Sequence, residues 1–211
     1  MLRTRVTALE SYRRVLQEEY AREDELIASI KGKPFEPNQY MLAGTAFHAI
    51  LADPDKHREG DKDGGYYTSK GWFFDEETTD VAVLHVGKGS CEVPGFKIFQ
   101  TSHGPITVNG ICDRINGKII RDAKATWSTP DAKNYERSLQ WKLYLQLFEA
   151  DQFAYDIFAF SEPKDGFCKL RDIVSFNLFR YPEIGADCER WVRDFVQWAD
   201  DRHLLGYLEV K

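Results

Sequence analysis

The stretch that decides the fold is Gly110-Ile-Cys-Asp-Arg-Ile-Asn-Gly-Lys-Ile-Ile-Arg-Asp-Ala-Lys124, in which two apolar segments flank one turn signal. Asn116-Gly117 predicts a tight hairpin, because both central residues of a type I′ turn need positive φ. Side chains alternate along a strand, so Asp122 and Lys124 share one face, and Asp113 on the partner strand can meet it. Two carboxylates beside an amine are what metal-assisted hydrolysis of a phosphodiester requires.

The Asp-x-Lys pattern is weak on its own. It recurs at Asp131-Ala-Lys133, which follows a proline in an expected loop. Asp122 differs because it ends an apolar, strand-like run and has a second aspartate across the expected hairpin. The alternative is a surface hairpin with an ordinary Asp–Lys ion pair, which contributes little stability. The hairpin alone leaves both interpretations open.

A glycine and a histidine lie on one face of a helix expected over residues 38–52. Gly44 and His48 are four residues apart, and a glycine permits close approach of another backbone. His48 lies among Phe47, Ile50 and Leu51, so a partly buried core histidine is the alternative to a metal ligand.

An amide and a phenol share one face of a second helix, which is expected over residues 135–149. They are Gln140 and Tyr144, again four residues apart. The helix is rich in Leu, Phe, Trp and Tyr, so Tyr144 can also be a core residue whose hydroxyl is satisfied. The two roles are compatible.

The order of these motifs is Gly-x-x-x-His, Gly-x-x-Asp, Asp-x-Lys and Gln-x-x-x-Tyr. In this order they resemble the RecB-like branch of the PD-(D/E)XK nuclease superfamily, which includes phage recombination exonucleases and CRISPR-associated adaptation nucleases. The segment from Thr7 to Tyr12 resembles the opening helix of that family. Each motif is weak singly, and the combination is specific.

The resemblance implies a metal centre with Mg²⁺ or Mn²⁺ as cofactor, as one or two ions. Asp113 and Asp122 would ligate the metal together with the backbone carbonyl of Ala123. His48 would be a further ligand that helps to hold a second ion or favours Mn²⁺, because imidazole suits softer metals than Mg²⁺. Many relatives carry Glu where this chain has Asp122, so the metal spacing can differ by one methylene.

The resemblance also implies the catalytic and substrate-binding residues. Lys124 would orient or polarise the attacking water and stabilise the negative charge that builds on phosphorus. Gln140 and Tyr144 would position this lysine or a DNA phosphate. Arg137 lies three residues before Gln140, so we expect it on the same helical face as a phosphate contact.

Composition predicts one globular domain over residues 1–211. The hydrophobic content of 43% provides a sizeable core. No apolar run can span a bilayer and the N-terminus lacks a signal-peptide core, so we expect no membrane partner and a cytoplasmic location in a bacterium or phage-infected host. The four cysteines form no Cys-x-x-Cys pair, so we expect neither a disulfide framework nor a zinc site, nor the iron–sulfur cluster of some relatives.

The net charge of −6 argues against DNA binding, because non-specific DNA binders usually present a basic surface. An enzyme that surrounds its substrate can still concentrate cations in a groove. The candidate groove cations are Arg13, Arg14, Arg114, Arg121, Lys133, Arg137 and Lys142. Arg121 is the weakest candidate, since it should point away from the face of Asp122. Trp127 is a candidate for stacking on a base, although a buried aromatic is the commoner role.

The overall pattern predicts an α/β fold with a restriction-endonuclease-like core: a mixed central β-sheet flanked by helices, with the active site at one edge of the sheet. Expected strands cover residues 81–86, 95–101, 106–115, 118–126, 155–160 and 170–179. Expected outer helices cover residues 7–32 and 182–205. The charged segment 53–80 is expected to be irregular, with 62–65 as a mobile loop near the substrate entrance.

We therefore expect a metal-dependent DNA exonuclease that acts on the ends of linear DNA, duplex or single-stranded, in phage-type recombination or repair. Similar phage enzymes work beside a single-strand-annealing protein and can form rings, so such a partner and a homo-oligomer are further expectations. One alternative is an endonuclease of the same fold, which a supercoiled circle as substrate would reveal. Others are a catalytically silent DNA-end or partner-binding module and a metal-binding protein that ignores DNA.

Overall fold

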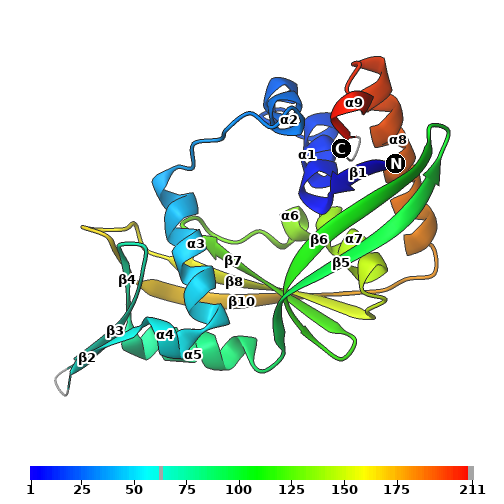
Figure 1. Ribbon diagram of the computed structural model, residues 1–211. Coiled ribbons are helices and arrows are strands. Elements are labelled where there is room, and N and C mark those ends of the chain that lie inside the picture. Colours follow the sequence, from blue (N-terminus) through cyan, green and yellow to red (C-terminus); the bar gives the residue numbers. More distant parts are fainter. Residues whose placement is uncertain (62–63, 209–211) are drawn as a thin grey trace.

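A six-stranded sheet forms the centre of the computed structural model, which describes residues 1–61 and 64–208 (Figure 1). The strands run in the order β1-β6-β7-β8-β10, and β5 pairs with β6 outside this path. Their bounds are β1 (Leu2–Arg5), β5 (Ser90–Thr101), β6 (Gly104–Asn116), β7 (Ile119–Thr126), β8 (Gln152–Phe160) and β10 (Leu170–Phe179). The pairs β1–β6 and β7–β8 are parallel and the others antiparallel, which confirms the prediction of a mixed sheet.

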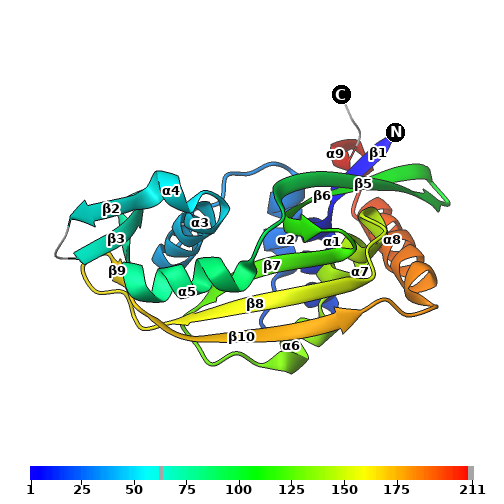
Figure 2. The same ribbon diagram turned by 90° about the horizontal axis from the view of Figure 1, so that it is seen from below.

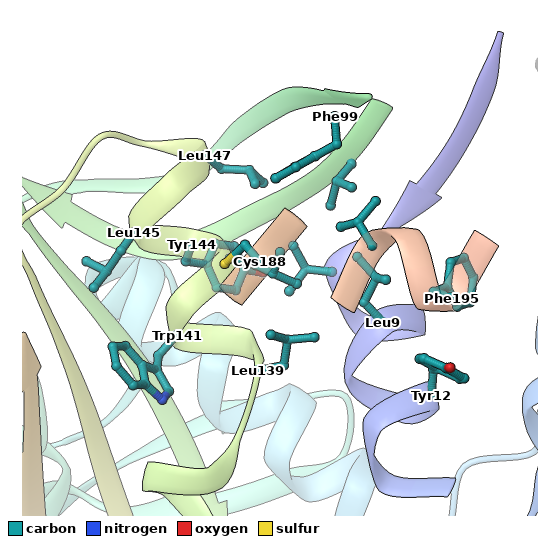
Figure 3. Close-up of a cluster of buried hydrophobic side chains, with 14 of the residues drawn as sticks. Leu9, Tyr12, Phe99, Leu139, Trp141, Tyr144, Leu145, Leu147, Cys188 and Phe195 are labelled. Carbon is teal, nitrogen blue, oxygen red and sulfur yellow. The ribbon is translucent and has the colours of Figure 1, made fainter. Parts of the chain in front are cut away.

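The larger hydrophobic core lies between the sheet and three helices, which are α1 (Val6–Gln17), α7 (Gln140–Leu147) and α8 (Ile184–Asp201). Figure 3 shows part of this cluster, in which Leu9 of α1, Tyr144 of α7 and Phe195 of α8 are all buried. Apolar residues along α8 recur at helical spacing, so one side of this helix is buried and the other is charged.

A second, smaller core covers the opposite face of the sheet beneath α3 (Gln39–Ala52) and α5 (Glu76–Val86). Phe47 of α3 packs on Phe158 of β8 and on Phe160, with ring centroids 5.0 and 4.9 Å apart. Figure 2 shows α3 and α5 along the part of the sheet that contains β7, β8 and β10. The side chain of Asn38 accepts a hydrogen bond from the Met41 amide, so α3 begins where the sequence predicted.

Segment 53–80, which we expected to be irregular, contains a helix and three strands. They are α4 (Pro54–His57), β2 (Arg58–Asp61), β3 (Gly64–Ser69) and β4 (Trp72–Asp75), and β9 (Phe167–Cys168) completes a four-stranded sheet. The prediction was wrong because it weighed charge above the alternating aromatic residues, of which Tyr67 and Phe74 are buried against α3 and α5. Of the expected mobile loop, residues 62 and 63 lie outside the described residues.

The strand expected at 81–86 is the end of helix α5. Asp75 caps this helix by accepting a hydrogen bond from the Thr78 amide, and the buried residues Thr79, Ala82 and Val86 recur every three to four positions. The apolar run was short enough to fit either period, and the cap decides for the helix.

The long helices expected at 7–32 and 135–149 are each broken. The first divides into α1 and α2 (Glu23–Ile30), because Glu18 and Arg22 take extended backbone angles. The second divides into α6 (Ala132–Arg137) and α7, because Ser138 is also extended, with φ −59° and ψ 137°. The last described element, after α8, is a single turn, α9 (Leu205–Leu208). In the described part of the chain, no helix is both long and apolar enough to cross a membrane.

Candidate active site

The predicted carboxylates lie where two inner strands of the sheet separate. Strands β6 and β7 pair beside their turn, where Arg114 is opposite Arg121, and then diverge. Asp113 and Asp122 are the first residues beyond that pair. Each strand has a further neighbour, β1 and β5 for β6 and β8 for β7, so the prediction that the site lies at an edge of the sheet was wrong.

The two carboxylates approach this gap from opposite faces of the sheet. Asp122 points toward α7, where its Oδ1 accepts a hydrogen bond of 3.0 Å from Nε2 of Gln140. Asp113 points toward α3: its Oδ2 accepts a bond of 2.9 Å from the Ala123 amide and lies 3.4 Å from Nδ1 of His48. The strand separation is what allows both to reach one space.

Asp122 combines deep burial with an incomplete set of partners. Its exposed fraction is 3%, and its Oδ2 has no hydrogen-bond partner among the described residues. Lys124 contacts this oxygen only as an ion pair, with Nζ 2.7 Å away. Burial is the main cause of a raised pKa at Asp122; Lys124 opposes it and Asp113 adds to it, and together these effects bring the pKa to about 6.

The charge states of the neighbouring groups follow from this burial. Burial acts to lower the pKa of Lys124, but Asp122 and Asp113 outweigh it, so the pKa is raised and the ammonium stays protonated. Burial, assisted by Lys124, lowers the pKa of His48, so its imidazole is neutral at pH 7 and has a lone pair for a metal. Burial also raises the pKa of Asp113.

Tyr144 supports the site from within the core. It is 5% exposed, and its hydroxyl donates a 2.8 Å hydrogen bond to the carbonyl of Ile111, two residues before Asp113. A Cβ at Gly110 would lie 2.9 Å from the Tyr144 ring, so this ring needs the glycine of Gly-x-x-Asp. At Gly44 a Cβ would lie 3.6 Å from the Cβ of Ala125, an ordinary contact, and the expected close backbone approach is absent there.

Arg137 does not share a helical face with Gln140, contrary to our expectation, because Ser138 separates α6 from α7. Arg137 instead lines a surface pocket between α6 and the end of α1, together with Arg13 and Tyr20. Its predicted contact with a phosphate at the catalytic gap therefore has no support from its position.

Most of the other candidate groove cations are engaged in internal contacts. Arg13 pairs with Glu10 and Glu18, and Arg14 also pairs with Glu18. The guanidinium of Arg114 donates to the carbonyls of Leu51 and Gly87, that of Arg121 bonds to Asp156, and Lys142 lies 3.7 Å from Asp187. These residues fasten elements together, and a basic surface for DNA does not arise from them.

An open groove with a volume of about 890 Å³ leads away from the catalytic gap. His48, Asp113 and Lys124 line one end, and Tyr40, Trp127 and Glu162 are among the residues that line the rest. Within the described residues, Lys124 is the one lysine or arginine in its wall. The Trp127 ring lines this groove, stacks on Phe160 with centroids 5.6 Å apart and contacts the tilted ring of Tyr40 at 5.2 Å, and its stacking on a base stays a prediction.

Sequence reasoning missed Glu92, a third carboxylate at the gap. It lines the groove next to His48 and Asp113, and its φ of +51° is unusual for a residue inside a strand. The signal was the turn at Thr101–Gly104: pairing the strands outward from this turn places Glu92 opposite Asp113.

The donors at the gap suit an oxygen-preferring divalent ion. Within residues 1–61 and 64–208, no group of three or more His, Cys, Asp or Glu side chains is arranged as a complete set of metal ligands. Magnesium does not need one, because it keeps several waters and is often bound by only one or two carboxylates. Asp122 provides the test of fit: its buried Oδ2 makes no hydrogen bond among the described residues and contacts only the Lys124 ammonium, so a divalent cation beside it would stabilise it further. Asp113, His48 and the Ala123 carbonyl complete the available set.

The comparisons with known proteins show the fold. No protein-family model and no curated protein matches this sequence significantly. Among solved structures, the chain is similar to SSO0001, with a TM-score of 0.55, 16% identity, and coverage of 94% of this chain and 77% of that one. It is also similar to LHK-Exo, an alkaline exonuclease from Laribacter hongkongensis, with a TM-score of 0.53, 14% identity, and coverage of 95% and 89%. The chain therefore shares the fold of these structures, an α/β fold with a mixed central sheet flanked by helices, as its sequence predicted.

Proposed function

We propose that this chain is a metal-dependent deoxyribonuclease that removes nucleotides from the ends of linear DNA. The observation that carries the proposal is the gap between β6 and β7, where Asp113, Asp122 and Lys124 meet and one buried oxygen of Asp122 has no hydrogen-bond partner among the described residues. The similarity to LHK-Exo supports an exonuclease, and that enzyme was also crystallised with dAMP, a deoxynucleotide.

The metal centre would use groups from both faces of the sheet. Asp122 and the Ala123 carbonyl belong to β7, Asp113 to β6 and His48 to α3. A divalent ion held there would supply Lewis-acid chemistry, neutralising the phosphodiester and lowering the pKa of bound water. We propose Mg²⁺ or Mn²⁺, as one or two ions.

Lys124 is the group best placed to act on the substrate. Its Nζ is fixed 2.7 Å from Asp122 while the side chain still lines the open groove, so its charge faces both the carboxylate and an entering phosphate. It would orient the attacking water and stabilise the charge that develops on phosphorus. Its raised pKa keeps it protonated, so it does not act as the general base.

Gln140 and Tyr144 would act through other residues. The amide of Gln140 holds Asp122 in place, and the hydroxyl of Tyr144 holds the strand that carries Asp113. Both are therefore positioning residues, and neither lines the groove among the described residues. Such supporting contacts affect a metal site without touching its substrate.

The biological setting extends the same proposal. The substrate would be linear duplex or single-stranded DNA, and the process phage-type recombination or repair in a bacterial or phage-infected cytoplasm. A single-strand-annealing protein and further copies of this chain would be partners. An endonuclease of the same fold is the nearest alternative, and it differs in its action on closed circles.

Digestion of end-labelled linear duplex DNA with Mg²⁺, Mn²⁺ or EDTA tests the proposal. We expect metal-dependent release of nucleotides that Asp122→Ala and Lys124→Ala abolish. Lys133→Ala is a matched control, because Lys133 belongs to the second Asp-x-Lys pattern, in α6 on the surface. Cleavage of a supercoiled circle would indicate an endonuclease, and activity that survives in Asp122→Ala would exclude the proposed site.

A further inference from the structure

Glu92 has a backbone conformation that interrupts the ladder beside the catalytic gap. In β5, Cys91 pairs with Arg114 and Val93 with Cys112, so the register places Glu92 opposite Asp113. Glu92 and Asp113 are not paired, and the φ of Glu92 is +51°. Residues other than glycine adopt this left-handed region rarely, and such conformations concentrate at functional sites.

The side chain of Glu92 belongs to the same space as Asp113 and His48. The open groove and a smaller cavity behind it share these three residues in their walls. The carboxylate of Glu92 therefore adds a negative charge to the space that Asp113 lines. Arg114, one residue after Asp113, does not neutralise this charge, because its guanidinium donates to the carbonyls of Leu51 and Gly87.

The gap therefore gathers more negative charge than its protein neighbours balance. Lys124 is paired with Asp122, whose second carboxylate oxygen is buried and makes no hydrogen bond within the described residues. Carboxylates that converge without a cation repel one another, and a divalent ion converts this repulsion into attraction.

We propose that Glu92 supplies a third carboxylate to the metal centre, on the side of Asp113 that faces α3, and raises the affinity of the centre for divalent ions. The inference rests on the proposed function, because it assumes the metal centre formed by Asp113 and Asp122. The exposed side chain of Glu92 would turn toward the ion when it binds.

Calorimetric titration with Mn²⁺ alone, without DNA, tests this inference on the full chain. We expect Glu92→Gln to weaken Mn²⁺ binding about tenfold. Glu162→Gln is the matched control, because Glu162 lines the same groove but bonds to Tyr40, and we expect it to bind Mn²⁺ like the unsubstituted protein. Asp122→Asn reports on the centre itself and should lose measurable binding.

A second substitution separates the carboxylate from the backbone. Glu92→Gly keeps the left-handed conformation accessible and removes only the side chain. We expect it to bind Mn²⁺ as weakly as Glu92→Gln, with Glu92→Asp intermediate. Unchanged affinity in either the Gln or the Gly protein would overturn the role of Glu92 while Asp122→Asn still lost binding. If Asp122→Asn bound Mn²⁺ normally, the proposed metal centre itself would be wrong.

Discussion

Two buried carboxylates on neighbouring strands, Asp122 on β7 and Asp156 on β8, have opposite environments. Ala123 pairs with Asp156, so the two aspartates are offset by one position and face opposite sides of the sheet. Asp156 is fully buried and accepts hydrogen bonds from two nitrogens of Arg121, both at 2.7 Å, and from Ser175 at 2.7 Å, with His85 at 3.0 Å. Asp122 is almost as buried, yet it has Gln140, the Lys124 ion pair and one oxygen with no hydrogen bond.

The difference distinguishes a structural carboxylate from one that is available to a ligand. A buried charge is tolerated when partners satisfy every lone pair, and Asp156 has this arrangement. It joins β7, β8, β10 and α5 beside the strand that carries the site. Asp122 has fewer partners: Gln140 and the Lys124 ion pair offset part of the cost of its burial, and a divalent cation would stabilise its second oxygen further. Burial alone does not distinguish the structural carboxylate of Asp156 from the carboxylate of Asp122. The number of hydrogen-bond partners does distinguish them.

The largest expected effect comes from Asp122→Asn, which removes the buried carboxylate charge from the gap. We expect the rate of metal-dependent cleavage of linear DNA to fall roughly a thousandfold, because the ion would lose a central ligand. The free energy of unfolding in EDTA, measured by urea denaturation at pH 4, should change little, because Asp122 is then mostly protonated in the folded protein. Normal cleavage by the Asp122→Asn protein would show that Asp122 does not have the functional role that distinguishes it from Asp156.

Asp156→Asn should show the reverse pattern. Breaking a buried ion pair by removing one partner costs roughly 3 kcal/mol, because Arg121 is left uncompensated. Urea denaturation measures this loss, and cleavage per folded molecule should stay within a few fold of the unsubstituted protein. Ser175→Ala is the control: it removes one neutral donor from the same carboxylate, for about 1 kcal/mol. Equal stability of the Asp156→Asn protein would mean that this network is not structural.

Local signals predicted the parts of the fold that local interactions decide. The hairpin of β6 and β7 forms where the Asn116-Gly117 signal predicted it, and Asn38 correctly marked the start of α3. The predicted type I′ turn was wrong: the turn residues are Gly117 and Lys118, and Gly117 has positive φ whereas Asn116 does not. The α5 cap formed by Asp75 and Thr78 was present in the sequence, but the apolar run after it was short enough to be taken for a strand. The β2-β3-β4-β9 sheet depends on long-range pairing with β9, which no local pattern announces.

For the site too, local sequence signals predicted some residues, and long-range contacts determined the others. Asp113, Asp122 and Lys124 come from one hairpin, so spacing and turn chemistry found them together. Asp156 was missed, although a lone aspartate in the apolar run of β8 predicts that some partner exists. Its partners Arg121, His85 and Ser175 come from three other elements, and only the tertiary structure identifies them.

Gln140 tests whether the partners of Asp122 position it for catalysis. In Gln140→Met the side chain keeps its length but cannot donate to Asp122, and we expect kcat to fall about tenfold with KM nearly unchanged. A rise in KM alone would instead show that Gln140 binds DNA. Gln152→Met is the matched control, because Gln152, the first residue of β8, bonds to Asn177 of β10 and does not contact Asp122.

The smallest expected effect concerns pH, and it contrasts Asp122 with a carboxylate that has charged partners near the surface. Burial acts to raise the pKa of Glu18, but hydrogen bonds from Arg14 and Arg13 outweigh it and lower this pKa from 4.5 to about 2. A lowered pKa means that Glu18 stabilises the fold above pH 4.5 and loses this contribution as the pH falls toward 2. Glu18→Gln should therefore cost about 1 kcal/mol at pH 7, less at high salt, and almost nothing near pH 2.

Asp122 should show the opposite slope in EDTA. Its pKa rises from 3.8 to about 6 on folding, so between these values the folded protein binds more protons than the unfolded chain, and its stability falls as the pH rises. From pH 4 to pH 6, the free energy of unfolding of the unsubstituted protein should fall relative to that of the Asp122→Asn protein. Over the same range, it should stay constant or rise relative to that of the Glu18→Gln protein. Urea denaturation of the three proteins across this range measures both slopes. Parallel curves would show that Asp122 is as well compensated as Glu18, and the oxygen that we assign to the metal would then have a partner within the protein.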